Sequence, residues 1–155
     1  ELEVAISLIK SQSRLEWMVE KLSEIGVSSI SFITTKHSER KKLKYQRLTK
    51  KTISALKQCK SLFLTDLNET VSFDNFIRQH RDTNNKFYAD IDYNKKFNSS
   101  LKGKKCLLVI GPEGDFSENE KKLMSDNGFK KISLGNSILR TETAAVVGGY
   151  LLKNL

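Results

Sequence analysis

The sequence predicts one α/β domain in which a mostly parallel sheet is flanked by helices. Three observations indicate this architecture. Segments typical of strands alternate with segments typical of helices along the chain. A length of 155 residues, 38% of them hydrophobic, suits one compact core. Finally, residues 106–110 form an unbroken apolar run, which is typical of a buried parallel strand. We therefore expect a single domain over residues 1–155.

Strands are predicted where a short run of apolar or alternating residues is bounded by glycine or polar residues. Runs of this kind recur along the whole chain, with helical segments between most of them, as the crossover connections of a parallel sheet require. The predicted strands are residues 2–9, 29–34, 86–91, 105–110 and 131–134.

Helices are predicted where apolar residues repeat with a period near 3.6, as they do from residue 15 to residue 25. Ser117 and Glu120 can form a capping box at the start of one helix. The last predicted helix is apolar nearly all round, so it must be buried against the sheet or a second subunit. Its Gly148 and Gly149 indicate either a helix end or a close backbone contact. The predicted helices are residues 14–25, 45–60, 72–80, 118–127 and 141–152.

The positive charge of the chain is concentrated in one segment. The net charge is +9, and residues 36–60 contain ten Lys and Arg residues but a single acidic residue. Acidic and basic residues balance in the rest of the chain. A concentrated basic stretch attracts a polyanion such as nucleic acid, although a solvated helix face is the alternative.

Two classes of protein are disfavoured by composition. No apolar run approaches the roughly 20 residues that a membrane-spanning helix needs, so we expect no membrane attachment. Cys59 and Cys106 lie far apart and near no pair of histidines, which favours reduced thiols over a disulfide or a metal site. The sequence therefore predicts a cytoplasmic protein without a metal.

Residues 109–120, Val-Ile-Gly-Pro-Glu-Gly-Asp-Phe-Ser-Glu-Asn-Glu, form the first candidate binding segment. A buried strand ends there in a tight turn, and ligands of open parallel sheets bind beyond such strand ends. Gly111 and Gly114 allow close approach of a ligand to the backbone. Glu113 and Asp115 would repel a phosphate and tolerate a cationic ligand. An ordinary connection between a strand and a helix is the alternative.

Residues 132–150, Ile-Ser-Leu-Gly-Asn-Ser-Ile-Leu-Arg-Thr-Glu-Thr-Ala-Ala-Val-Val-Gly-Gly-Tyr, form the second segment. A short strand ends at Leu134 and Gly135, and a loop leads into the apolar helix. Arg140 is the one charged residue of that loop. It can pair with Glu142 or with helix-end carbonyls. Alternatively, it can face an RNA phosphate or a negative charge that develops on a base.

These two segments resemble those of the ribosomal RNA small subunit methyltransferase E family. The matching motifs are Gly-Pro-Glu-Gly-Asp-Phe-Ser-x-x-Glu and Leu-Gly-x-x-Ile-Leu-Arg-Thr-Glu-Thr-Ala. Shorter segments at residues 20–27, 37–40 and 55–59 are also similar to the family. The family makes N3-methyluridine and belongs to the SPOUT superfamily. The resemblance therefore implies a SPOUT-type fold with a C-terminal deep trefoil knot and a methyltransferase that uses S-adenosylmethionine (SAM).

The resemblance also implies a substrate, a set of cofactor-binding residues and an oligomeric state. The substrate would be a specific uridine of 16S ribosomal RNA, either free or in the small ribosomal subunit. Relatives are homodimers, which fits the apolar final helix. The residues that would hold SAM are Gly111, Glu113, Gly114, Leu134, Gly135, Ile138, Leu139 and Thr143.

The expected reaction needs groups that deal with charge and with a proton. N3 of uridine carries a proton that must leave during methyl transfer. We expect Arg140 to stabilise negative charge on the uridine ring, and Glu142 to orient Arg140 or accept the proton through water. The basic segment would hold RNA phosphates. The residues expected to do so are Arg40, Lys41, Lys42, Lys44 and Arg47.

The family usually carries an N-terminal, barrel-like (PUA-like) RNA-binding domain that this sequence does not contain. The sequence begins with Glu1 directly in a strand-like run, so we expect a fragment that can bind cofactor yet hold RNA poorly. Two alternative functions stay open. One is a knotted RNA-binding module without activity, which the intact motifs argue against. The other is a SPOUT enzyme that acts on transfer RNA or on ribose 2′-oxygens.

Overall fold

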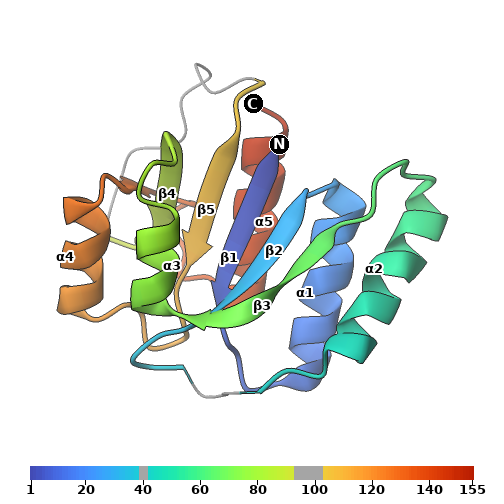
Figure 1. Cartoon of the computed structure of the whole chain (residues 1–155), viewed down its shortest axis with the longest axis horizontal. Helices are drawn as coiled ribbons and strands as arrows, with labels where there is room; N and C mark the ends of the chain where they lie inside the picture. Colours follow the sequence, from blue (N-terminus) through green and yellow to red (C-terminus); the bar gives the residue numbers. More distant parts are fainter. Residues whose placement is uncertain (39–41, 93–102) are drawn as a thin grey trace.

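A computed structural model describes residues 1–38, 42–92 and 103–155. In these parts of the chain, six strands form one sheet in the order β3-β2-β1-β5-β4-β6, and every pairing is parallel (Figure 1). The carboxyl ends of the strands therefore lie at one edge of the sheet. The strands are β1 (Leu2–Ser7), β2 (Ser29–Thr34), β3 (Asp66–Ser72), β4 (Asn85–Ala89), β5 (Cys106–Ile110) and β6 (Lys130–Ile132).

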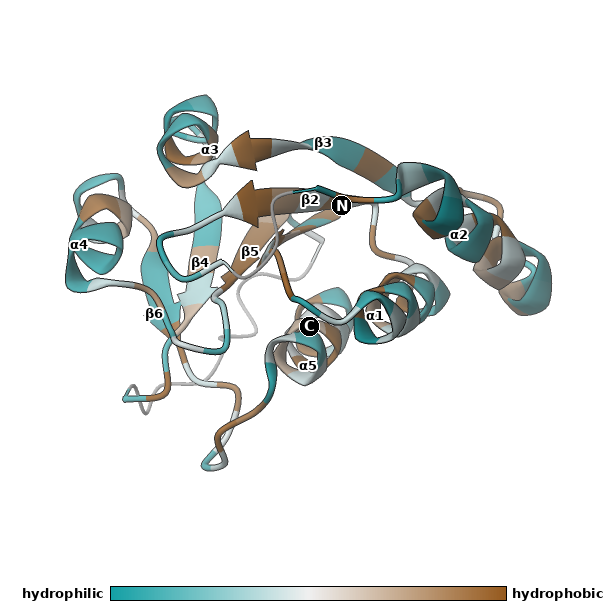
Figure 2. Cartoon of the chain, turned by 90° about the horizontal axis from the view of Figure 1, so that it is seen from below, coloured by the Kyte–Doolittle hydropathy of each residue, from teal (hydrophilic) through white to brown (hydrophobic). Residues whose placement is uncertain are grey.

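Helices cover both faces of the sheet and give a domain of three layers. Figure 2 shows α1 and α5 side by side on one face, with α2 beyond α1, and α3 and α4 on the other face. The helices are α1 (Gln12–Ile25), α2 (Tyr45–Cys59), α3 (Phe73–Gln79), α4 (Glu118–Asp126) and α5 (Thr141–Lys153).

Each face of the sheet has its own hydrophobic core. In β1, Val4 and Ile6 pack toward α1 and α5, whereas Ala5 between them packs toward α3 and α4. Every residue of β5 is buried, as the unbroken apolar run predicts for a central parallel strand. The predicted α/β architecture with a parallel sheet is thus confirmed.

Helix α5 packs against its neighbours through glycine. A Cβ atom added to Gly148 would lie 2.5 Å from Leu108 Cδ2 of β5. A Cβ atom added to Gly149 would lie 2.9 Å from Leu22 Cδ2 of α1. Of the two explanations that the sequence allows for these glycines, close contact is therefore the right one.

Strand β3 is absent from the sequence-based prediction. It lies at the edge of the sheet, pairs with β2 and has the sequence Asp-Leu-Asn-Glu-Thr-Val-Ser. None of its residues is fully buried. An edge strand can be held by backbone hydrogen bonds to its one neighbour without burying apolar side chains of its own. The hydropathy pattern of these residues therefore does not indicate a strand. The trefoil knot that the resemblance implies stays a prediction.

A partly buried polar network joins β1, β2 and β3 to the end of α3. Glu3 accepts a hydrogen bond from Ser31 Oγ (2.5 Å) and pairs with His80 Nε2 (3.2 Å), while Asn68 donates to Ser31 (2.8 Å). Burial opposes charging of both partners. The bonds to Glu3 and to the carbonyl of Phe76 nevertheless raise the pKa of His80 above 6.5. The bonds from His80 and Ser31 likewise hold the pKa of Glu3 below 4.5.

We expect this pair to stabilise the fold most between pH 4.5 and pH 6.5. The contribution of His80 is complete below 6.5 and is lost as the pH rises through its raised pKa. The contribution of Glu3 is complete above 4.5 and is lost as the pH falls through its lowered pKa. His80→Gln should therefore reduce the free energy of unfolding, measured with urea, more at about pH 6 than at about pH 9. Equal losses at both pH values would contradict a charged pair.

Candidate active site

The carboxyl ends of β4, β5 and β6 lie side by side, and the loops that follow them enclose a cavity, here called the strand-end cavity. Its empty space is about 640 Å³ when the open mouth is included, and the part of the space that the walls enclose is about 100 Å³. Its walls are formed by Ala89, Asp90, Ile91, Ile110, Gly111, Pro112, Glu113, Asp115, Leu134, Gly135, Ser137, Ile138, Leu139, Thr141 and Ala144.

The turn after β5 is tightly folded on itself. A Cβ atom at Gly111 would lie 2.9 Å from the ring of Phe116, so only glycine fits there without a shift. Asp115 adopts the left-handed conformation (φ 62°), and its amide donates to the carbonyl of Pro112 (2.9 Å). Its side chain accepts from the amide of Phe116 (2.7 Å). Helix α4 then begins with the predicted capping box of Ser117 and Glu120, which is confirmed.

Three other elements hold this turn from outside. Thr141 Oγ1, at the start of α5, donates to the carbonyl of Gly111 (2.9 Å). Lys121 Nζ of α4 lies 2.7 Å from Asp115 Oδ2. His37 Nδ1, from the loop after β2, lies 3.0 Å from the carbonyl oxygen of Asp115. A turn fixed by bonds from three elements is preorganised for a ligand.

A buried carboxylate gives the strand-end cavity negative charge. Asp90 follows β4, is 4% exposed and lies 2.9 Å from Lys131 Nζ. Burial opposes its ionisation, but the bonds from Lys131 and from the amide of Asp92 outweigh burial and lower the pKa of Asp90. Glu113 and Asp115 also line the cavity, and each of the three carboxylates is paired with a cation that is not part of the lining. The lining itself thus contains three carboxylates and no basic side chain, which disfavours a phosphate.

Three charged side chains meet beside this cavity. Arg14 Nη1 of α1 lies 2.6 Å from Glu113 Oε1 and 3.3 Å from Glu142 Oε1. The bond to Glu113, followed by that to Glu142, raises the pKa of Arg14. Glu142 is 4% exposed, and its Oε2 has no hydrogen-bond partner in the described part of the chain. A buried carboxylate oxygen without a partner is unfavourable, so this atom needs a hydrogen-bond donor that the described residues do not supply.

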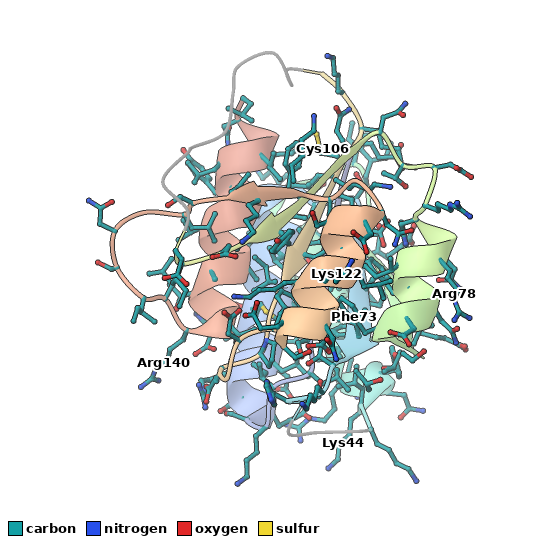
Figure 3. All side chains as sticks on the ribbon, turned by 90° about the vertical axis from the view of Figure 1, so that its left-hand side faces the viewer. Lys44, Phe73, Arg78, Cys106, Lys122 and Arg140 are labelled. Atoms are coloured by element: carbon teal, nitrogen blue, oxygen red, sulfur yellow. The ribbon has the colours of Figure 1, made fainter. Side chains whose placement is uncertain are left out.

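A second cavity, here called the arginine cavity, adjoins the first. Its empty space is about 600 Å³ with the open mouth included. Three of its residues also line the strand-end cavity, so the two spaces lie next to each other. Figure 3 shows Arg140 at this side of the molecule, pointing away from the body of the protein. The walls of the arginine cavity are formed by Arg14, Glu113, Ile138, Leu139 and Arg140.

The structure brings most of the residues expected to hold cofactor to the strand-end cavity. Gly114 and Thr143 are the two that do not line it. Gly114 lies against His37, since a Cβ atom there would be 3.5 Å from His37 Cβ. Thr143 is half-buried in the first turn of α5, where its neighbour Thr141 lines the cavity instead. The residues that do line it are Gly111, Glu113, Leu134, Gly135, Ile138 and Leu139.

The two residues expected to be catalytic lie close in sequence but in different environments. Arg140 is exposed, lines the arginine cavity and makes no ion pair with a described residue. Glu142 is buried and pairs with Arg14 rather than with Arg140. The expectation that Glu142 orients Arg140 directly therefore finds no contact among the described side chains.

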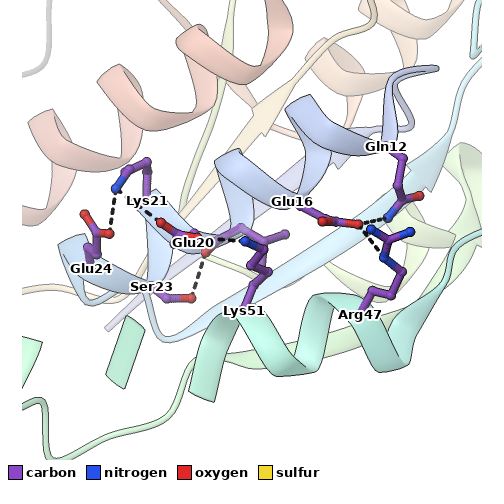
Figure 4. Close-up of polar contacts among 9 residues, drawn as sticks. Gln12, Glu16, Glu20, Lys21, Ser23, Glu24, Arg47 and Lys51 are labelled. Carbon is purple, nitrogen blue, oxygen red and sulfur yellow. Dashed lines mark hydrogen bonds and ion pairs between the residues drawn. The ribbon is translucent and has the colours of Figure 1, made fainter. Parts of the chain in front are cut away.

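The basic segment has two kinds of side chain. Arg47 of α2 lies 2.9 Å from Glu16 of α1, and Lys51 lies 3.2 Å from Glu20, so these cations hold the two helices together (Figure 4). Such partly exposed pairs contribute about 0–1 kcal/mol each. The remaining basic side chains of the described segment make no ion pair with described residues. They are Lys36, Lys42, Lys44, Lys50, Lys57 and Lys60.

Among the predicted RNA-binding residues, Lys42, Lys44 and Arg47 are exposed. Arg40 and Lys41 lie outside the described residues. The described part of the chain contains no group of three or more His, Cys, Asp or Glu residues that could hold a metal ion. No helix in residues 1–38, 42–92 and 103–155 is long and apolar enough to cross a membrane.

Three residues of the site are missing from the sequence-based prediction. Asp90 and Thr141 could have been found, because Asp90 follows a predicted strand at the cavity edge and Thr141 lies inside the second motif. Arg14 gives no such signal. It lies 99 positions before Glu113 in the sequence, and only the packing of α1 beside α5 brings it to the site.

The sequence of the chain matches the model of one protein family, the RNA methyltransferase domain. The chain belongs to that family, since the family's sequence model matches residues 1–152. The SPOUT-type α/β fold expected from the resemblance agrees with this membership.

Within the family, the chain is similar to ribosomal RNA small subunit methyltransferase E of Rickettsia conorii. The two are 29% identical over 152 residues, which cover 94% of this chain and 61% of the relative. The chain thus spans about three-fifths of the length of that relative.

Two solved structures show the same fold. A protein from Legionella pneumophila, described as a methyltransferase and solved with SAM bound, superposes with a TM-score of 0.90 at 29% identity. The match covers 99% of this chain and 66% of that one. A protein from Porphyromonas gingivalis, described as an rRNA methyltransferase, has a TM-score of 0.89 at 36% identity, with coverage of 96% and 65%.

Proposed function

We propose that this chain is the catalytic domain of a methyltransferase that transfers a methyl group from SAM to N3 of a uridine in 16S ribosomal RNA. The observation that carries the proposal is the strand-end cavity, which is built from the two motif segments in a domain of the RNA methyltransferase family. The Rickettsia relative is named as a small-subunit ribosomal RNA methyltransferase, and the Legionella relative holds SAM.

The strand-end cavity fits SAM in its chemistry. Ile110, Leu134 and Leu139 give apolar walls for the faces of the adenine ring, and the backbone of the two turns offers donors and acceptors for its edge. The carboxylates of Asp90 and Glu113 suit a cofactor that carries a sulfonium and an ammonium group. SAM supplies an activated methyl group on a good leaving group, so the task of the protein is mainly positioning.

The side chains beside the cavity account for the remaining chemistry. Uridine N3 loses its proton as it gains the methyl group, and negative charge spreads over the ring before the transfer is complete. Arg140 provides positive charge for that ring. Glu142, whose buried Oε2 has no hydrogen-bond partner among the described residues, would accept the proton through a water molecule that enters beside it.

The proposal also covers the RNA substrate, the domain organisation and the cellular compartment. Exposed lysines of the basic segment, among them Lys42 and Lys44, would bind the phosphates of RNA or of the small ribosomal subunit. We assign one methyltransferase domain to residues 1–155 and the additional length of the relatives to a separate RNA-binding domain. Both cysteines are free, in keeping with a protein of the cytoplasm.

Calorimetric titration with SAM tests the cofactor site. We expect saturable binding to the wild-type chain and no binding to Gly135→Trp, because Gly135 lines the cavity at φ 128°, so a large side chain there must change the shape of this wall. Circular dichroism must show that the variant is folded. Absence of binding to a folded wild-type chain would contradict the proposal and favour an RNA-binding module without activity.

Methyl transfer to small ribosomal subunits that lack this modification tests the reaction. Arg140→Ala should lower the rate by about 100-fold or more and leave SAM affinity unchanged, since Arg140 acts on the ring and not on the cofactor. Digestion of the product RNA identifies the modified nucleoside. A methyl group on a ribose oxygen would assign the chain to the other SPOUT activity, and a fully active Arg140→Ala variant would remove this arginine from the mechanism.

We also propose that the chain forms a homodimer through α1 and α5. A groove between these helices is nearly all apolar, and Tyr150 and Leu151 beside it are 58% and 39% exposed. Exposed apolar area on neighbouring helices is typical of a subunit interface. The groove is lined by Lys21, Glu24, Ile25, Val146, Val147, Tyr150 and Leu151.

Sedimentation of Tyr150→Lys tests this interface. The charge should weaken dimerisation by about tenfold or more, because a lysine ammonium group in an apolar interface must lose its hydration. Leu62→Lys is the matched control, since Leu62 is 90% exposed on the loop between α2 and β3. Loss of the dimer in both variants, or in neither, would contradict an α1–α5 interface.

A further inference from the structure

The arginine cavity has the composition of a site for a small polar ring. Ile138 and Leu139 provide apolar surface, and Ile138 is 84% exposed. Arg14 and Arg140 also line it, and a guanidinium group donates hydrogen bonds in a plane. Arg140 is exposed and makes no ion pair with a described residue, so its side chain can turn toward a bound ring. Glu113, Ile138 and Leu139 belong to both cavities, so a ring in the arginine cavity would adjoin a ligand in the strand-end cavity.

Arg14 is held in place and still has donors to spare. Its two ion pairs, with Glu113 and Glu142, both run through Nη1. In the described parts of the chain, neither Nη2 nor Nε makes a hydrogen bond, although a guanidinium group has five N–H donors. The side chain is 34% exposed. An arginine fixed by two carboxylates and open on its other edge is preorganised to bind an acceptor.

We propose that the arginine cavity binds the methyl-accepting base, and that Arg14 and Arg140 donate to the two carbonyl oxygens that flank N3 of a uracil ring. This inference rests on the proposed function and adds the substrate subsite and a catalytic residue, Arg14. Uracil has a carbonyl group on each side of N3, and each of the two carbonyl oxygens would accept hydrogen bonds from one of the two arginines. Cytosine has an amino group in place of one carbonyl and would set donor against donor, so the pair selects uracil.

The two arginines also account for the charge of the reaction. The N3–H bond breaks, its proton goes to the carboxylate of Glu142 through water, and the electron pair forms the new N3–CH₃ bond as the S–CH₃ bond breaks. While N3 is unprotonated, the negative charge lies largely on the flanking oxygens. Hydrogen bonds from Arg14 and Arg140 stabilise that anion more than the neutral ring, which is the requirement for catalysis.

Single-turnover methyl transfer to RNA that contains the target uridine tests the role of Arg14. We expect Arg14→Met to lower the rate by about 100-fold or more when SAM is saturating, a condition chosen because Arg14 also pairs with Glu113 of the strand-end cavity. Arg14→Lys keeps the positive charge but lacks the planar set of donors, so its rate should lie between those of the wild type and of Arg14→Met. Arg78→Met, at an exposed arginine of α3, is the matched control and should react like wild type.

A substrate with 5-fluorouridine at the target position separates a chemical role from a structural one. Fluorine makes N3 more acidic, so less stabilisation of the anion is needed. The defect of Arg14→Met should then shrink by about tenfold, whereas a merely misfolded site would show the same defect with both substrates. The assignment of Arg14 would be overturned if Arg14→Met reacted at a rate near that of the wild type, or if its defect were the same with both substrates.

Binding of nucleotides, followed by the NMR signals of the Ile138 and Leu139 methyl groups, is independent of turnover. In the presence of S-adenosylhomocysteine, uridine monophosphate should shift these signals more than cytidine monophosphate does, and Arg14→Met should abolish the difference. Absence of shifts, or a preference unchanged in the variant, would refute the subsite. If the wild-type chain transfers no methyl group, the proposed function fails, while these shifts still decide what the arginine cavity binds.

Discussion

Close packing of α5 on the sheet is the contact on which the candidate site depends. Gly148 and Gly149 bring the helix backbone against Leu108 of β5 and Leu22 of α1, where a single added methyl group would overlap its neighbour. The start of α5 is thereby held against the turn after β5 and against the guanidinium group of α1. Because protein interiors respond to such overlap by shifting whole elements, a larger residue at either glycine would move both cavity walls together.

The parts of the site that the sequence predicts are those whose cause is local. The turn after β5 depends on Gly111, Asp115 and the capping box of α4, all within one short segment. Likewise, the five consecutive apolar residues of β5 are enough to predict that this strand is buried on both faces. The position of the cavity can be predicted from this turn and this strand, because ligands of open parallel sheets bind beyond the carboxyl ends of the strands.

The parts that the sequence does not predict depend on contacts between distant segments. Arg14 meets Glu113 and Glu142 only because α1 and α5 pack side by side on one face. Strand β3 is held by its pairing with β2, and its own residues are too polar to indicate a strand. The sequence predicts that the basic segment binds RNA phosphates, yet Arg47 and Lys51 of this segment pair with carboxylates of α1. Composition gives the charge of a segment but not its partners.

The order of strands has a consequence for folding during synthesis. Strands β1, β2 and β3 neighbour one another in the sheet and are made first. Strand β4 is made next, but in the described sheet its neighbours are β5 and β6, which both follow it in the chain. The largely apolar β4 therefore leaves the ribosome before any strand can pair with it. The half of the domain that carries the strand-end cavity assembles only when synthesis is nearly complete, and until then β4 is a segment that chaperones would be expected to protect.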